Sequence, residues 1–280
     1  SVVIESNLQG LAVDLPAPAV KTAAESIPLR IERRLLAANQ DRLSLSLGEI
    51  VSMNLLRHSE VGHSVITHGT VRFGGAAAEP DRNGVWVSGA VKTLDVDRWL
   101  AFSGQVGGDT RIEWGGVDVK LGALDVFRRR FSEVAVNAAM QGGQWRGSLS
   151  GKELEGTITW QPQGRGRIFA RMKTLTIPAA APAVAQIPGE AGAERKGYEL
   201  PAIDLVAEQF INKDKLLGRL EANAVPEGLD WRIEKLRIVN PESTFALDGV
   251  WHVSLAQPRT QVNLRLEASD GGKLLTRLGY

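Results

Sequence analysis

The sequence predicts a mostly β-sheet protein, an antiparallel meander with two short helices. Three observations predict it. Apolar and polar residues alternate with a period of two along most of the chain, turn residues separate the alternating runs, and one stretch of the chain recurs further on. The runs are too short for amphipathic helices, which favours strands.

Alternation is clearest at Leu43, Leu45 and Leu47, which are interleaved with Ser44 and Ser46. Successive side chains of a strand point to opposite faces, so this run is typical of a half-buried strand. The same pattern predicts further strands at residues 29–36, 65–73, 85–91, 111–114, 117–121, 134–138, 154–160, 168–172, 217–224, 245–253 and 262–266.

Glycine and asparagine pairs lie between many of these runs, where adjacent antiparallel strands are expected to reverse. They are Gly74-Gly75, Asn83-Gly84, Gly107-Gly108, Gly115-Gly116, Gly142-Gly143 and Asn240-Pro241.

Two segments favour short helices instead. Residues 95–100 follow a predicted strand, and Asp95 or Asp97 could accept hydrogen bonds from the amides of a first turn. Residues 269–279 repeat the arrangement, with a capping candidate, paired leucines and a glycine stop at Gly279.

Composition narrows the possible functions. Of the 280 residues, 43% are hydrophobic and 23% are charged, which is typical of folded globular proteins. The formal net charge of +1 provides no basic field, so we expect no nucleic-acid partner. The chain has no cysteine, which excludes thiolate metal sites and cysteine nucleophiles.

The chain contains no run of roughly 20 apolar residues that could cross a bilayer. It also starts without Met or a signal sequence, and we expect it to be a piece of a longer protein.

Residues 177–200 are rich in Ala, Pro, Gly and Glu and predict a flexible loop. The chain then consists of a first meander over residues 1–176, this loop, and a second meander over residues 201–280. We expect the second meander to continue the same sheet, although a domain boundary in the loop is the alternative.

An internal repeat supports a regular architecture. Residues 117–146 align without a gap with residues 203–232. The identical pairs are Asp118 and Asp204, Asn137 and Asn223, Ala138 and Ala224, Gly142 and Gly228, Trp145 and Trp231, and Arg146 and Arg232. Alternation alone can generate such matches, so chance similarity is the alternative. Each copy predicts a strand, turn, strand, turn, strand unit that must bury its apolar face against something else.

Several segments resemble the YhdP branch of the AsmA-like proteins. They are residues 6–18, the pair of segments 87–89 and 94–99, and the tail with residues 201–205, 230–232 and 278–280. These motifs are structural and none is catalytic. The resemblance implies a protein of the Gram-negative envelope, held in the inner membrane by an anchor elsewhere in the full-length protein and extending through the periplasm.

The resemblance also implies a long, strongly curved sheet that forms an open groove or half-pipe for phospholipid acyl chains moving between membranes. The proposed partners are these acyl chains and other envelope proteins. The resemblance assigns no lipid-contacting residue to positions of this chain, so the groove residues are predicted from alternation alone. They are Val134, Val136, Leu220, Ala222, Ile233 and Leu264. The alternative is that the same residues form the dry core of a sandwich, in a structural or partner-binding scaffold.

The histidines and the basic turns are two further groups of candidate site residues. His58, His63 and His68 are spaced by five residues, which places successive ones on opposite strand faces, so we expect no metal site. Guanidinium groups match phosphate oxygens, which makes basic turns candidate phosphate contacts. The two basic turns comprise Arg128, Arg129 and Arg130, and Arg165 and Arg167.

No catalytic residues are predicted. The sequence has no Gly-x-Ser-x-Gly elbow, and its Gly142-Gly143 segment lacks the Lys-Ser/Thr ending of a phosphate loop. We therefore expect no enzyme activity and no cofactor. Trp99, Trp145 and Trp231 are expected to be large anchors in the core or at its edge.

Overall fold

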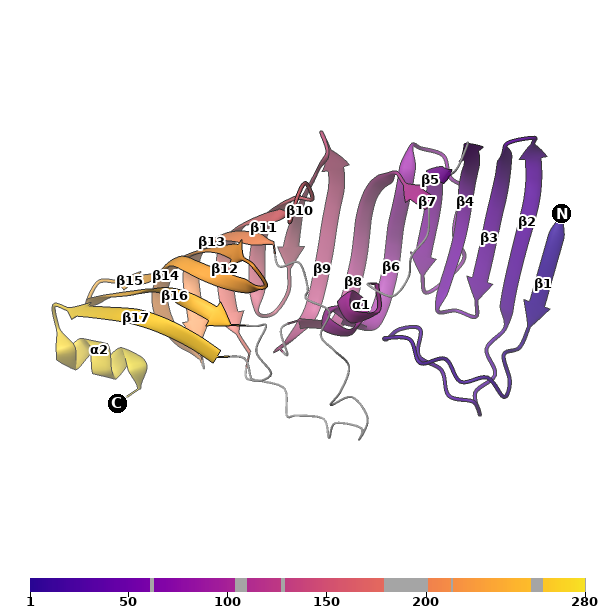
Figure 1. Cartoon of the computed structure of the whole chain (residues 1–280). Helices are drawn as coiled ribbons and strands as arrows, with labels where there is room; N and C mark the ends of the chain where they lie inside the picture. Colours follow the sequence, from indigo (N-terminus) through magenta and orange to yellow (C-terminus); the bar gives the residue numbers. More distant parts are fainter. Residues whose placement is uncertain are drawn as a thin grey trace. The chain divides into compact units, whose positions relative to one another are not determined.

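The computed structural model describes residues 1–60, 63–103, 110–126, 129–178, 201–212, 214–252 and 259–279. Strands make up 71% of the structure, and they form one mixed sheet of 17 strands (Figure 1). The prediction of a mostly β protein with two short helices is confirmed. The structure has two compact units, Ser1–Asp125 with Glu133–Met140, and Val126–Ser132 with Gln141–Tyr280. This division does not coincide with the predicted loop at 177–200, of which residues 179–200 lie outside the described residues.

Unit 1 contains the first eight strands and part of the ninth. They are β1 (Val2–Ser6), β2 (Leu29–Ala37), β3 (Gln40–Leu47), β4 (Val51–Glu60), β5 (His63–Phe73), β6 (Gly84–Asp95), β7 (Thr110–Ile112), β8 (Trp114–Val126) and β9 (Arg129–Gln141), with helix α1 (Val96–Ser103) between β6 and β7. The predicted alternating runs do not include β1 and β4, nor the strands that the structure has at residues 144–150, 202–212 and 230–240.

Unit 2 contains the rest of β9 and the remaining elements. They are β10 (Gln144–Ser150), β11 (Leu154–Gln161), β12 (Arg167–Ile177), β13 (Ala202–Asn212), β14 (Lys215–Glu227), β15 (Asp230–Asn240), β16 (Ser243–His252), β17 (Arg259–Ala268) and helix α2 (Gly271–Leu278). In Figure 1 the strands turn from nearly upright at β10 to nearly horizontal at β17, which is the accumulated twist of a long sheet.

Most sequential strands pair antiparallel, as predicted, but the sheet is not antiparallel throughout. β5 pairs in parallel with β6 and β7, β6 with β8, and β12 with β13. Parallel neighbours need a connection that returns the chain to the same end of the sheet. Between β5 and β6 this connection is residues 74–83, so Gly74-Gly75 and Asn83-Gly84 do not form the predicted tight reversals.

The connection from β5 to β6 is held by polar side chains of the sheet. Ser52 Oγ donates to the carbonyl of Gly75 (2.6 Å), and Asn54 Nδ2 donates to the carbonyls of Ala77 (3.1 Å) and Ala78 (3.2 Å). Three backbone carbonyls of this connection thereby accept hydrogen bonds from side chains. They need these donors because they do not pair within the sheet ladder.

The predicted reversal at Gly115-Gly116 is wrong, because both glycines lie inside β8. A Cβ at Gly115 would lie 2.2 Å from the Trp86 indole, and one at Gly116 would lie 2.3 Å from it. Glycine is needed here for close approach of the indole and not for a turn. The reversals at Gly142-Gly143 and Asn240-Pro241 are confirmed, whereas Gly107-Gly108 lies outside the described residues.

Both helices begin as the sequence predicts. Asp95 Oδ1 accepts from the amide of Arg98 (2.9 Å) at the start of α1. At α2, Asp270 Oδ1 accepts from the amide of Lys273 (3.0 Å), and Gly279 ends the helix in the left-handed region at φ 94°. Short capping side chains and a terminal glycine satisfy the free backbone groups at both ends of α2.

Of the three predicted tryptophan anchors, Trp231 is buried, and Trp99 and Trp145 are half-buried. Trp231 is buried, and its Nε1 donates to the carbonyl of Pro201 (3.0 Å), while its ring lies 5.5 Å from that of Trp251. Trp99 Nε1 donates to the carbonyl of Ala17 (2.8 Å), which ties α1 to the segment before β2. Trp145 lies opposite Trp160 in the β10–β11 ladder and is half-buried.

Candidate functional site

Unit 2 has one almost entirely apolar face. Residues opposite each other in a ladder project from the same face of a sheet, so the register identifies the members of each face. The middle row from β10 to β17 comprises Gly147, Ile158, Ala170, Leu205, Ala222, Leu236, Leu247 and Leu264.

Two further rows flank the middle row on the same face. One comprises Leu149, Gly156, Met172, Ala207, Leu220, Ile238, Phe245 and Leu266, and the other comprises Trp145, Trp160, Ile168, Ile203, Ala224, Ile233, Gly249 and Val262. No charged side chain interrupts these three rows, which together we call the unit 2 apolar face.

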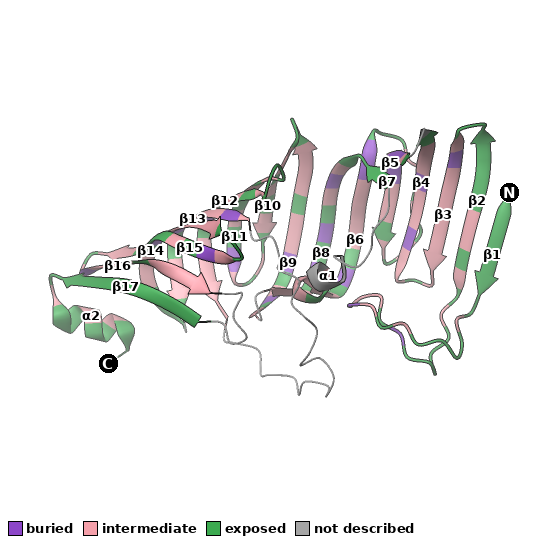
Figure 2. Ribbon diagram, viewed as in Figure 1, coloured by how far each residue is buried: buried purple, intermediate pink, exposed green. Residues whose placement is uncertain are grey.

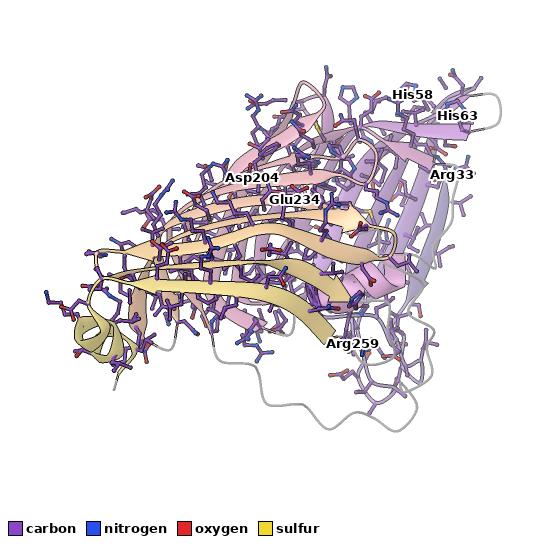
Figure 3. The ribbon with its side chains drawn as sticks, turned by 60° about the vertical axis from the view of Figure 1, so that its left-hand side comes forward. Arg33, His58, His63, Asp204, Glu234 and Arg259 are labelled. Carbon is purple, nitrogen blue, oxygen red and sulfur yellow. The ribbon has the colours of Figure 1, made fainter. Side chains whose placement is uncertain are left out.

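The opposite face of unit 2 is charged, with Asp204 and Glu234 among its members (Figure 3). Ion pairs link neighbouring strands across it: Lys173 with Glu155, Arg171 with Asp204, Arg219 with Glu208, and Lys235 with Glu221. Arg219 also pairs with Glu221 on its own strand. Exposed pairs of this kind contribute about 0–1 kcal/mol each, so their main effect is to keep this face in water.

Burial on the unit 2 apolar face falls toward β17. Ala207 is fully buried and Leu220 is 5% exposed, whereas Leu264 is 61% exposed, and Figure 2 shows β17 exposed along its length. Most side chains of the rows are only half-buried, which fits a face with one layer of protein behind it.

Unit 1 also separates apolar and polar residues by face. One apolar row comprises Ile4, Ile31, Leu45, Met53, Val71, Val87 and Val117, and a second comprises Leu29, Leu47, Val51, Phe73, Gly89 and Val119. Leu55, Ile66 and Val85 form a buried cluster on this unit 1 apolar face. The other face carries the serines that alternate with the leucines of β3.

The structure brings four of the six predicted groove residues together. Leu220, Ala222, Ile233 and Leu264 all belong to the unit 2 apolar face, although they differ widely in exposure. The other two are Val134 and Val136, which share one face of β9 in unit 1. Val134 is 1% exposed, so its side chain is packed within the protein.

The contacts found for His58 and His68 are with different residues, and neither is with another histidine. His58 approaches Gln40 (3.4 Å between Nε2 atoms), and His68 Nδ1 lies 3.0 Å from Thr67 Oγ1. His58 and His63 are labelled in Figure 3 at the ends of β4 and β5. Within the described parts of the chain, no group of three His, Asp or Glu side chains could hold a metal ion.

The predicted phosphate contacts at residues 128–130 are only partly visible. Arg128 lies outside the described residues, and Arg129 Nη1 donates to the carbonyl of Pro178. Arg130 also has an interaction partner. A phosphate role for this turn therefore remains a prediction, as it does for Arg165 and Arg167.

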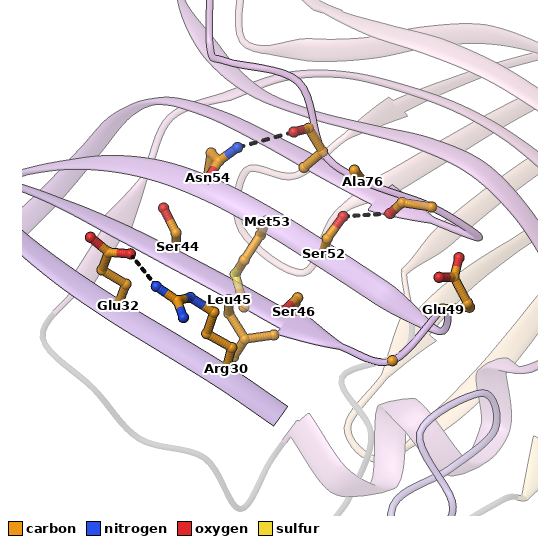
Figure 4. A pocket seen from close by; sticks show the side chains of 13 residues that line it. Arg30, Glu32, Ser44, Leu45, Ser46, Glu49, Ser52, Met53, Asn54 and Ala76 are labelled. Atoms are coloured by element: carbon orange, nitrogen blue, oxygen red, sulfur yellow. Dashed lines mark hydrogen bonds and ion pairs between the residues drawn. The ribbon is translucent and has the colours of Figure 1, made fainter. Parts of the chain in front are cut away.

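Two shallow hollows lie on the polar faces. The first, of about 350 Å³, lies between β2–β4 and the connection from β5 to β6, and Arg30, Ser44 and Asn54 are among its lining residues (Figure 4). The second, of about 650 Å³, lies over β15–β17 and is lined by Arg232, Asp248 and eight other residues.

Comparison with known proteins places the chain in a family. A family model described as YhdP protein matches residues 1–280, and this family is an envelope protein family. No curated protein matches the chain, and no solved structure matches it either. No described helix has the length and apolar character needed to span a membrane. Because the family model covers all 280 residues, the chain belongs to the YhdP family.

Proposed function

We propose that this chain is a non-enzymatic lipid-binding segment that holds phospholipid acyl chains on its unit 2 apolar face. The observation that carries the proposal is the set of three uninterrupted apolar rows from β10 to β17, with a charged face behind them. Acyl chains need a continuous apolar surface, and one face of a long sheet offers it without a closed cavity.

Family membership supports the setting of this role. In the full-length protein, which we place in the periplasm with an inner-membrane anchor, such a surface would carry phospholipids between the inner and outer membranes. Aliphatic side chains dominate the rows, and aromatic residues are only 6% of the chain, which suits flexible hydrocarbon chains. The scattered titratable groups give no reason to propose enzyme activity or a cofactor.

The test compares lipid retention between matched variants. The chain purified from bacterial membranes should retain phospholipid that mass spectrometry detects. Leu236→Gln combined with Leu264→Gln places two polar groups in the middle row, and we expect at least about tenfold less bound lipid, because burying a leucine contributes about 1.5–3 kcal/mol. Leu264 is already exposed, so its substitution leaves the fold intact.

The matched control makes the same kind of change on the charged face. Val206 and Val239 are half-buried there, and Val206→Gln with Val239→Gln should keep the bound lipid. Circular dichroism should show that both double variants are folded. Equal retention in the native chain and the Leu236→Gln, Leu264→Gln variant would refute the assigned face. Lipid-free native protein that co-purifies with an envelope protein would favour a scaffold function instead.

A further inference from the structure

On the unit 1 apolar face, three charged residues lie near the β2–β3 turn. Arg33, Asp41 and Arg57 occupy positions on β2, β3 and β4 that the alternation reserves for the apolar face. Arg33 lies opposite Leu43, and Asp41 lies between Leu35 and Arg57. We call these three side chains the rim cluster. Two residues further from the β2–β3 turn along each strand, on the same face, the side chains are apolar.

Asp41 is the centre of the rim cluster and is only 3% exposed. Arg57 donates twice to its carboxylate, from Nε to Oδ1 (2.9 Å) and from Nη2 to Oδ2 (2.6 Å), and Arg33 Nε donates to Oδ2. A buried carboxylate requires such partners. One guanidinium in bidentate geometry already neutralises it, so the second arginine is not needed for charge balance.

Arg33 therefore carries an uncompensated charge. Its side chain is 56% exposed, and among the described residues no acceptor contacts its two Nη groups. Two guanidiniums and one carboxylate give the rim cluster a net charge of +1, and Asp41 fixes the direction of the Arg33 fork. An oriented guanidinium with free Nη groups matches two oxygens of a phosphate.

The residues around the rim cluster indicate which class of phosphate compound it would bind. Leu43 and Leu55 lie beside it in the next row, and Ile66 lies opposite Arg57. The other charged residues of β2, such as Arg30 and Glu32, project from the opposite face. A cation at the edge of an apolar surface suits an amphiphile whose head is anionic and whose tails are hydrocarbon.

We propose that Arg33, oriented by Asp41 and Arg57, binds the phosphate of a phospholipid whose acyl chains lie on the unit 1 apolar face. This site rests on the proposed lipid-binding function and adds a second lipid position to it, on unit 1, with a headgroup contact. The same chemistry would accept free phosphate, so the experiment separates the two sources.

The test measures binding of three probes to the purified chain: phosphatidylglycerol, diacylglycerol with the same acyl chains, and inorganic phosphate. The native chain should bind phosphatidylglycerol about tenfold more tightly than diacylglycerol. Arg33→Gln should remove this preference without weakening diacylglycerol binding, and Arg33→Lys should keep part of it, because lysine preserves the charge but not the fork.

Arg30→Gln is the matched control, because it removes one exposed arginine from the same strand but from the opposite face. It should preserve the preference for phosphatidylglycerol. A preference that survives Arg33→Gln, or that falls equally in Arg30→Gln, would overturn the site. If neither lipid binds the native chain, the lipid-binding function fails. If inorganic phosphate then binds and its binding depends on Arg33, the rim cluster is a phosphate site whose ligand is free phosphate.

Discussion

Single residues show where the period-two pattern is broken and why. Asp41 occupies an apolar position of β3, and the two hydrogen bonds from Arg57, together with the one from Arg33, hold the pKa of its carboxyl below the ordinary value. Part of the signal was present in the sequence, since Arg33 and Asp41 stand at the apolar phase of the alternation in β2 and β3. Arg57 lies on β4, which the sequence patterns did not predict. Alternation alone could not show that the three side chains meet.

Asp41 should make stability depend on pH in acid. Its pKa is lower in the folded than in the unfolded chain, so its contribution is complete above about pH 4 and is lost as the pH falls through the folded-state pKa. We expect Asp41→Asn to lower the free energy of unfolding by about 2 kcal/mol at pH 7. The difference from the native chain should shrink steadily below about pH 4.

Urea denaturation at a series of pH values measures this difference. Glu155→Gln is the control, because Glu155 pairs with Lys173 at an exposed position and should contribute about 0–1 kcal/mol at every pH. A destabilisation by Asp41→Asn that stays constant down to pH 2 would show that the ionised carboxylate is not its source.

Secondary-structure elements were predictable where local chemistry defines them. The capping aspartates and the terminal glycine predict both helices, and alternation predicts most strands. Gly115-Gly116 was misread because a glycine pair signals either a turn or close approach of a bulky side chain. Only the position of Trp86 on the neighbouring strand distinguishes the two.

The position of α2 depends on contacts far away in the sequence. Arg277 Nε and Nη2 donate to the carboxylate of Glu242 (2.9 and 2.7 Å), and Nη1 donates to the carbonyl of Leu216 (3.0 Å). Both partners of the ion pair are partly buried. We infer that Arg277 is the main attachment of α2 to the ends of β14 to β16.

Removing this attachment should release α2 without unfolding the sheet. For Arg277→Gln we expect amide hydrogen exchange in residues 274–278 to rise about tenfold or more, because hydrogen bonds to charged groups contribute about 1.5–3 kcal/mol. Exchange in β14 and β15 should change little. Lys273→Gln, at a more exposed position of the same helix, is the control. Unchanged exchange in Arg277→Gln would mean that other contacts hold α2.

At the scale of the whole molecule, two strands present exposed edges. Every residue of β1 and of β17 is exposed, and among the described residues β1 has a register with β2 and β17 with β16. Open strand edges pair readily with other chains, and a net charge near zero gives little repulsion. The isolated chain should therefore self-associate as its concentration rises.

Sedimentation velocity over a range of concentrations measures this self-association. Ile4→Lys with Val262→Lys places one lysine in each exposed strand, and we expect it to shift the protein toward monomer. Asn137→Lys with Thr157→Lys adds the same charge to interior strands and serves as the control. Equal association of the two double variants would exclude the strand edges as its cause.

The sequence by itself determined the class of structure and the separation of faces, because period-two alternation and capping chemistry act between residues close in the chain. It also identified four members of the unit 2 apolar face. The tertiary structure alone decided which strands are neighbours, where the ladders run parallel, and how the rows align from β10 to β17. The reason is physical: register and crossover connections are set by packing between distant segments, and a one-residue shift would exchange the two faces of any strand.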